Sequence, residues 1–99
     1  MEIRYQDSSL ERLEADPKYL GGFSAAVVSA FRKRINFIRQ ARNERDLYAW
    51  KSLRIEKLKG DRKDQHSMRL NDQWRLIFTI EAGADGKYFL VISIEDYHD

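Results

Sequence analysis

The sequence predicts a single α+β domain, and two observations carry this prediction. Helical patterns fill the first half of the chain, whereas three runs with strand-like alternation and short connections fill the second half. The length of 99 residues suffices for one hydrophobic core and leaves no room for a second domain. We therefore expect one domain over residues 1–99, in which a short N-terminal strand and helices pack on a C-terminal antiparallel sheet.

The first 22 residues predict a short strand and a short helix. The stretch EIRY at residues 2–5 alternates polar and apolar side chains, as a half-buried strand does. Ser8 stands three residues before Glu11, and this capping-box spacing predicts a helix in the stretch SSLERLEA. Pro17 and the Gly21–Gly22 pair then interrupt the chain.

The clearest helix is predicted over residues 24–43. Its apolar side chains recur on one stripe of a 3.6-residue period, and they are Val27, Phe31, Ile35 and Ile38. Residues 43–50 predict a second helical piece, with Asn43 as its N-cap. Residues 51–65 are rich in charge and predict a loop that a few apolar side chains anchor.

Three strands are predicted over residues 66–70, 74–81 and 88–94. The connections between them consist of turn-forming residues, and Asp85–Gly86 is a strong hairpin signal. Short loops between successive strands favour an antiparallel meander.

Alternation along these strands sorts their side chains between two faces. Arg69 and Arg75 are expected on a common side of the sheet, opposite much of the core. The last strand leads directly into the polar residues 96–98, which can converge with the two arginines there. Trp50 and Trp74 are both expected in the core.

The composition excludes several functional classes. The chain has no cysteine, which rules out disulfides, thiolate catalysis and cysteine-based zinc sites. No apolar run approaches the roughly 20 residues of a membrane span, and the N-terminus lacks the apolar core of a signal peptide. We therefore expect a soluble, cytoplasmic protein without a membrane association.

The net charge of +2 conceals an uneven distribution. Between Arg32 and Arg75 the chain carries 14 Lys or Arg and 6 Asp or Glu, whereas the two ends together are acidic. Clustered cations attract phosphates and release counterions when they bind, so the basic segment favours a nucleic-acid partner. The same surplus is also found on solvated helix faces, which is the competing interpretation.

The polar residues near the strands favour metal-free RNA cleavage over other chemistry. His66 and His98 are far apart in the sequence, and Glu95 and Asp96 are adjacent, so no metal-ligand pattern emerges and no cofactor is expected. A Ser-His-Asp triad lacks a nucleophile-elbow motif. A basic cluster with an imidazole and a phenol suits proton transfer to and from a ribose and charge stabilisation on a phosphate.

Three stretches resemble a known family. They are LKGDR at residues 58–62, QHSMRLNDQWRLIF at residues 65–78 and EDYH at residues 95–98. In order and spacing they are similar to the HigB group of the RelE/ParE toxin superfamily. The resemblance implies a compact α+β toxin of a type II toxin-antitoxin system, which cuts mRNA on the translating ribosome without metal. It also implies a partner, a helix-turn-helix antitoxin of the HigA type.

The resemblance also implies the site residues. The catalytic residues are expected to be Lys59, Arg75, Asp96, Tyr97 and His98. His98 is the expected general acid, Asp96 orients it or acts as the base, and Tyr97 stacks on a nucleotide.

Further residues of the basic segment complete the expected site. Lys57, Arg62, His66 and Arg69 are expected to bind RNA. Some family members carry a catalytic histidine three residues before the lysine of the Lys-Gly-Asp motif, where this chain has Glu56. Glu56 is therefore an alternative base.

Two other functions remain open at this point. A ParE-like protein has a similar fold but inhibits DNA gyrase without cleaving RNA. A weakly active or inactive RNA-binding homologue is the third possibility. The terminal Tyr-His pair and the Lys-Gly-Asp-Arg loop favour the nuclease.

Overall fold

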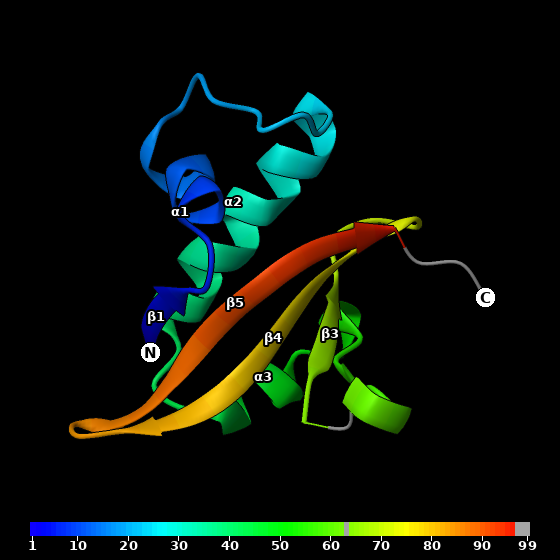
Figure 1. The fold of residues 1–99 in the computed structure, drawn as a ribbon. Helices are drawn as coiled ribbons and strands as arrows, with labels where there is room; N and C mark the ends of the chain where they lie inside the picture. The colour runs from blue at the N-terminus through cyan, green and yellow to red at the C-terminus, as the bar shows by residue number, and fades with distance from the viewer. Residues whose placement is uncertain (63, 97–99) are drawn as a thin grey trace.

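A five-stranded sheet organises the part of the chain that the computed structural model describes, residues 1–62 and 64–96 (Figure 1). The strands are β1 (Glu2–Tyr5), β2 (Glu56–Lys57), β3 (His66–Arg69), β4 (Trp74–Gly83) and β5 (Gly86–Asp96). Their order across the sheet is β1-β5-β4-β3-β2. β1 pairs with β5 in parallel, and all other neighbours in this order pair antiparallel. The predicted α+β fold with an antiparallel C-terminal sheet is confirmed.

The helices follow the predicted pattern closely. They are α1 (Ser8–Ala15), α2 (Ala25–Gln40) and α3 (Glu44–Ala49). Ser24 caps α2 by accepting a hydrogen bond from the Val27 amide at 3.2 Å, and Asn43 caps α3 as predicted. The cap of α1 is Asp7 and not Ser8, because the Asp7 carboxylate accepts the Ser9 amide at 2.7 Å.

The segment expected to be a loop contains more structure than its charges indicate. It holds the short 3-10 helices η1 (Lys51–Leu53) and η2 (Gly60–Arg62), with β2 between them. β2 pairs with β3 through two exposed residues, Glu56 and Lys57, so it has no apolar alternation by which a strand is recognised. Trp50, expected in the core, is 55% exposed, which corrects that prediction.

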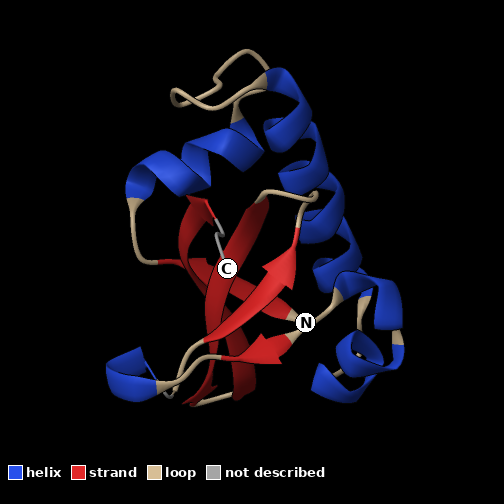
Figure 2. Cartoon of the chain, turned by 90° about the vertical axis from the view of Figure 1, so that its right-hand side faces the viewer, coloured by secondary structure: helices blue, strands red, loops and turns tan. Residues whose placement is uncertain are grey.

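One face of the sheet packs against the helices. α1 and α2 lie along this side (Figure 1), and the helices border the strands in the turned view of Figure 2. A bulge shifts the β4–β5 register between Ile77 and Phe78, so that Val91 and Ile94 both turn toward the helices. The core face of the sheet carries Met68, Leu76, Phe78, Phe89, Val91 and Ile94.

The apolar stripe of α2 supplies the other half of the core. The four predicted residues, Val27, Phe31, Ile35 and Ile38, are all buried together with Val28. Among the described residues, no helix combines the length and apolar character that a membrane-spanning helix needs.

Candidate functional site

The side of the sheet that faces away from the core collects polar and charged side chains, and we call it the polar face. It comprises Glu56, Ser67, Arg69, Arg75, Thr79, Ser93 and Glu95, with Ile77 among them. Arg75 lies directly opposite Arg69 on β3 and Glu95 on β5, so these three residues form a row across three strands. The prediction that Arg69 and Arg75 share the side opposite the core is confirmed.

Arg75 is the most constrained residue of this row. It is only 6% exposed, and its Nε donates a hydrogen bond to the Ser67 hydroxyl at 2.8 Å. One of its terminal nitrogens donates to the Arg54 carbonyl, at the end of η1. A buried guanidinium requires such acceptors, because an unsatisfied buried charge is costly. Arg75 therefore has a fixed orientation in the middle of the sheet.

A bidentate ion pair joins η2 to the end of β5. The Arg62 guanidinium donates to both carboxylate oxygens of Glu95, at 2.9 and 2.7 Å. The Ser93 hydroxyl donates to Glu95 at 2.6 Å, and Arg62 Nε donates to the Gln65 side chain at 2.9 Å. The hydrogen bonds from Arg62 lower the pKa of Glu95, and those to Glu95 raise the pKa of Arg62. This pair holds the segment that carries Lys59 and Gly60 against the sheet.

β2 divides its two charged residues between the faces. Glu56 pairs with Ser67 and therefore projects from the polar face, where it is exposed. Lys57 pairs with His66 and projects from the other face. Lys59 follows in the connection to η2, exposed to solvent, and Gly60 after it has a φ of +69° that favours glycine.

His66 lies on the core face, apart from Arg75. Its ring stacks on Phe78 with centroids 5.5 Å apart, and Tyr48 contacts it edge-on at 6.5 Å. Desolvation, followed by the nearby Lys57 charge, lowers the pKa of His66. Its Nδ1 is buried without a hydrogen-bond partner among the described residues. The structure thus separates His66 and Lys57 from Glu56, Arg69 and Arg75, which project from the polar face.

The C-terminal residues of the predicted site are described only in part. Asp96 pairs with Trp74 and accepts a hydrogen bond from the Gln73 side chain at 3.0 Å. Because Asp96 follows Glu95 directly in the strand, its side chain leaves on the side opposite Glu95. The predicted catalytic residues Tyr97 and His98 lie outside the described residues.

The sequence matches a family model over residues 3–97, and that model describes the HigB-like toxins, the RelE-like toxins of type II toxin-antitoxin systems. The chain belongs to this family. No curated protein matches the sequence.

Solved structures of similar fold are toxins as well. A YoeB/ParE toxin from Agrobacterium tumefaciens superposes with a TM-score of 0.65 at 19% identity, over 99% of this chain and 100% of its own. A chain of a YoeB–YefM complex from Staphylococcus aureus superposes with a TM-score of 0.59 at 18% identity, over 100% of this chain and 98% of its own. At these identities the likeness concerns the fold of this HigB-like chain.

The polar face of this HigB-like chain and the segment that Arg62 holds against it contain cations that differ in exposure. Arg75 is buried and fixed, Arg62 is half-exposed and paired with Glu95, and Lys59 is exposed. Arg69 forms an ion pair with Asp72. Among the described residues, no group of three or more His, Asp or Glu side chains is arranged to hold a metal ion. The arrangement can bind a phosphate and stabilise charge on it.

Sequence reasoning missed three contributors to this face: Ser67, Ser93 and Glu95. Strand alternation assigns Ser67 to the same side as Arg69, but its hydrogen bond with Arg75 required the pairing of β3 with β4. Glu95 and Ser93 required the register of β4 against β5, including the bulge. The sequence contains no local signal for that register.

Proposed function

We propose that this chain is the toxin of a type II toxin-antitoxin system and cleaves mRNA on the ribosome without a metal ion. The observation that carries the proposal is the row of Arg69, Arg75 and Glu95 across the polar face, with Arg75 buried and fixed. A fixed guanidinium is suited to a phosphate whose negative charge rises during the reaction, since it needs no reorganisation. Membership of the HigB-like toxin family supports the same function.

The proposed reaction is attack of a ribose 2′-oxygen on the adjacent phosphorus. The 2′-O–P bond forms while the P–O5′ bond breaks, a base removes the 2′-hydroxyl proton, and an acid protonates the leaving 5′-oxygen. Products are a 2′,3′-cyclic phosphate and a 5′-hydroxyl end. Lys59 and Arg75 stabilise the phosphate, while Arg62 and Arg69 bind the flanking backbone. Lys57 and His66 contact RNA from the core face of the sheet, apart from the row of Arg69, Arg75 and Glu95.

The strand geometry supports Glu56 as the base. Glu56 projects from the polar face beside Ser67, which holds Arg75, whereas Asp96 leaves its strand on the other side. In this assignment His98 is the acid, Asp96 orients the C-terminal residues, and Tyr97 stacks on a nucleotide.

The proposed partner is a small helix-turn-helix antitoxin of the HigA type, in the cytoplasm. The Staphylococcus aureus YoeB structures include complexes with YefM, which supports an antitoxin for a chain of this fold. The competing function is inhibition of DNA gyrase, because one similar structure is described as a YoeB/ParE toxin.

Mapping of mRNA ends in a translating extract tests the proposal. Addition of the purified chain should produce cleaved mRNA with 2′,3′-cyclic phosphate and 5′-hydroxyl ends, only when ribosomes are translating. Cleavage by a metal-activated water would instead leave 5′-phosphates. Intact mRNA together with inhibited DNA supercoiling by gyrase would support the competing function.

The variant Glu56→Gln tests whether Glu56 acts as the base without disturbing the fold. Glu56 is exposed, so this variant should fold normally and lose about 10²–10⁴-fold in cleavage rate. The matched control is Asp61→Asn, which removes an exposed carboxylate from the neighbouring η2 and should retain cleavage. Equal rates for Glu56→Gln and the unmodified chain would rule out Glu56 as the base.

A further inference from the structure

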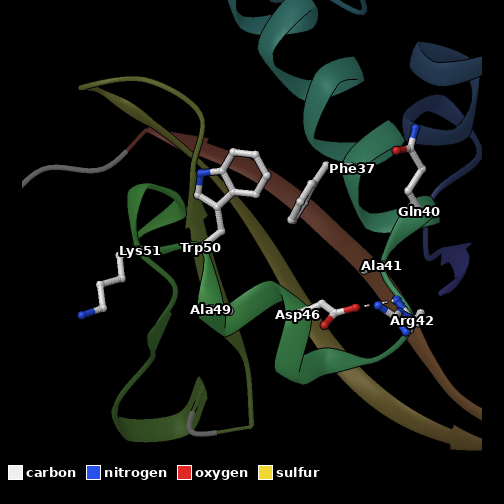
Figure 3. Close-up of a pocket in the computed structure, with 8 residues that line it drawn as sticks. All are labelled: Phe37, Gln40, Ala41, Arg42, Asp46, Ala49, Trp50 and Lys51. Carbon is white, nitrogen blue, oxygen red and sulfur yellow. Dashed lines mark hydrogen bonds between the residues drawn. The ribbon is translucent and has the colours of Figure 1, made fainter.

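The helical side of the molecule carries a hollow that the proposed cleavage does not use. It has a volume of about 740 Å³ and lies between the end of α2 and the α3–η1 segment (Figure 3). Its apolar lining comes from Phe37, Ala41, Ala49 and Trp50. α3 packs on the core face of the sheet, since Leu47 belongs to the core. The hollow therefore lies on the side of the sheet that the helices cover, whereas Arg75 faces the other side.

Trp50 is the most exposed large apolar side chain among the described residues, at 55%. Its ring meets Phe37 edge-on, with centroids 4.7 Å apart. A second, smaller hollow of about 230 Å³ is lined by the same two rings together with Arg34 and Leu53. The aromatic pair thus stands between two depressions, which is a shape that can receive side chains on either side of a fixed anchor.

The surroundings of the aromatic pair are mostly cationic. Arg42 and Lys51 line the larger hollow, and Lys33 and Arg34 line the smaller one. Asp46 is the carboxylate that lines the larger hollow, and it accepts a hydrogen bond from the Arg42 amide at 2.9 Å (Figure 3). An apolar centre with a positive rim is complementary to a segment that presents apolar side chains among carboxylates.

We propose that an acidic amphipathic segment of the antitoxin docks in this hollow, with an apolar side chain against Trp50. This inference rests on the proposed function, in which the chain has an antitoxin. Tryptophan is enriched among interface residues that dominate binding, since its ring buries a large area. Carboxylates of the segment face the four cations of the rim.

The lining favours a protein segment over RNA as the occupant. A nucleic-acid backbone needs cations along its length, whereas the floor of this hollow is apolar and its cations stand around the floor. The two alanines and Phe37 provide an apolar floor that an aliphatic or aromatic side chain can cover. RNA bound at Arg75 would also lie on the other face of the sheet.

Calorimetric titration tests the docking. The probe is the proposed helix-turn-helix antitoxin, purified and titrated into the full-length chain and its Trp50→Ala variant. Trp50→Ala should weaken Kd by about 30-fold or more. The matched control is Tyr48→Ala, because Tyr48 is 47% exposed at the end of α3, two residues before Trp50, but lines neither hollow. This control should bind within about threefold of the unmodified chain.

The outcomes separate this inference from the proposed function. If Trp50→Ala and the unmodified chain bind the probe with equal affinity, the docking site is wrong, but the antitoxin remains supported as the partner. No binding of the unmodified chain overturns both the antitoxin and the docking. Cleavage assays complete the test: Trp50→Ala should cut mRNA at the unmodified rate in the absence of the probe. Lost cleavage with retained probe affinity would instead make the hollow a ribosome or RNA contact and overturn the docking.

Discussion

The polar face of the sheet and the hollow beside Trp50 are both rich in cations, but the two regions differ in what surrounds those cations. On the polar face, arginines bind partners within the chain, as Arg75 does with Ser67 and Arg62 with Glu95. Around the hollow, Arg42, Lys51 and Lys33 border an exposed aromatic ring, while Arg34 donates a hydrogen bond to the Arg69 carbonyl at 3.0 Å. Held groups stabilise a reacting phosphate without reorganising, whereas exposed apolar area is stabilising only when a partner covers it. The first region suits chemistry, and the second suits docking.

The largest effect is expected from Phe78→Ala, which should damage both regions together. Phe78 is 1% exposed and stacks on Phe89 with centroids 4.2 Å apart, between the sheet and the helices. Its truncation should lower the free energy of unfolding by about 3–5 kcal/mol, measured by denaturant titration. The control Leu20→Ala removes a side chain that is 39% exposed and should cost far less. Equal stability of the two variants would contradict the assigned core.

Arg75→Ala should impair the function proposed for the polar face without affecting binding at the hollow. Loss of a fixed group that stabilises the phosphate is expected to reduce the cleavage rate by about 10²–10³-fold, while antitoxin affinity remains unchanged. Arg75→Lys should recover little, because an ammonium cannot reach both the Ser67 hydroxyl and the Arg54 carbonyl in the same planar geometry.

Cleavage assays beside thermal melts measure this effect. The melts identify the part of the loss that comes from unfolding, since Arg75 is buried. Unchanged cleavage by a folded Arg75→Ala chain would remove the polar face from the reaction.

Reversal of the Arg62–Glu95 pair should have a smaller effect. The two side chains are 42% and 39% exposed, so the pair contributes at most about 1 kcal/mol, a factor of about five in a rate that depends on it. Glu95→Gln should lower cleavage by up to that factor. The double exchange Arg62→Glu with Glu95→Arg should restore the position of η2 but not the RNA contact of Arg62. Full recovery of cleavage by the double exchange would show that the pair serves only to hold η2.

The smallest effect concerns His66 and the dependence of stability on pH. Burial lowers the pKa of His66 below its ordinary value of 6.5, so the folded chain binds a proton less readily than the unfolded chain does. The His66 contribution is therefore fully present above pH 6.5 and is lost as the pH falls through the lowered pKa. Thermal melts between pH 5 and 8 measure it.

The comparison for His66 uses a His98→Gln background, because the chain has two histidines. In that background His66→Gln should flatten the decline of the melting temperature just below pH 6.5. A decline of unchanged size would assign it to other groups.

Much of the fold was predictable because the signals were local. The apolar stripe of α2 recurs within eleven residues, and the alternation of β4 repeats every second residue, so each element's inner face follows from its own period. For the same reason Arg69 and Arg75 could be assigned to one side of the sheet before any register was known. The parallel pairing of β1 with β5 joins the two ends of the chain, and no short stretch specifies it.

The sequence by itself determined the fold class, the apolar stripe of α2 and the cations available to the polar face. Only the tertiary structure decided that Glu95 faces Arg75 and binds Arg62, because that arrangement depends on a bulge and on a contact across 33 residues. It also decided that His66 turns toward Phe78 and that Trp50 remains exposed. A residue's period within its own element predicts which neighbours share its face. The packing of distant elements decides which residue lies opposite and whether anything covers it. This is the physical reason that the sequence predicted only part of the site.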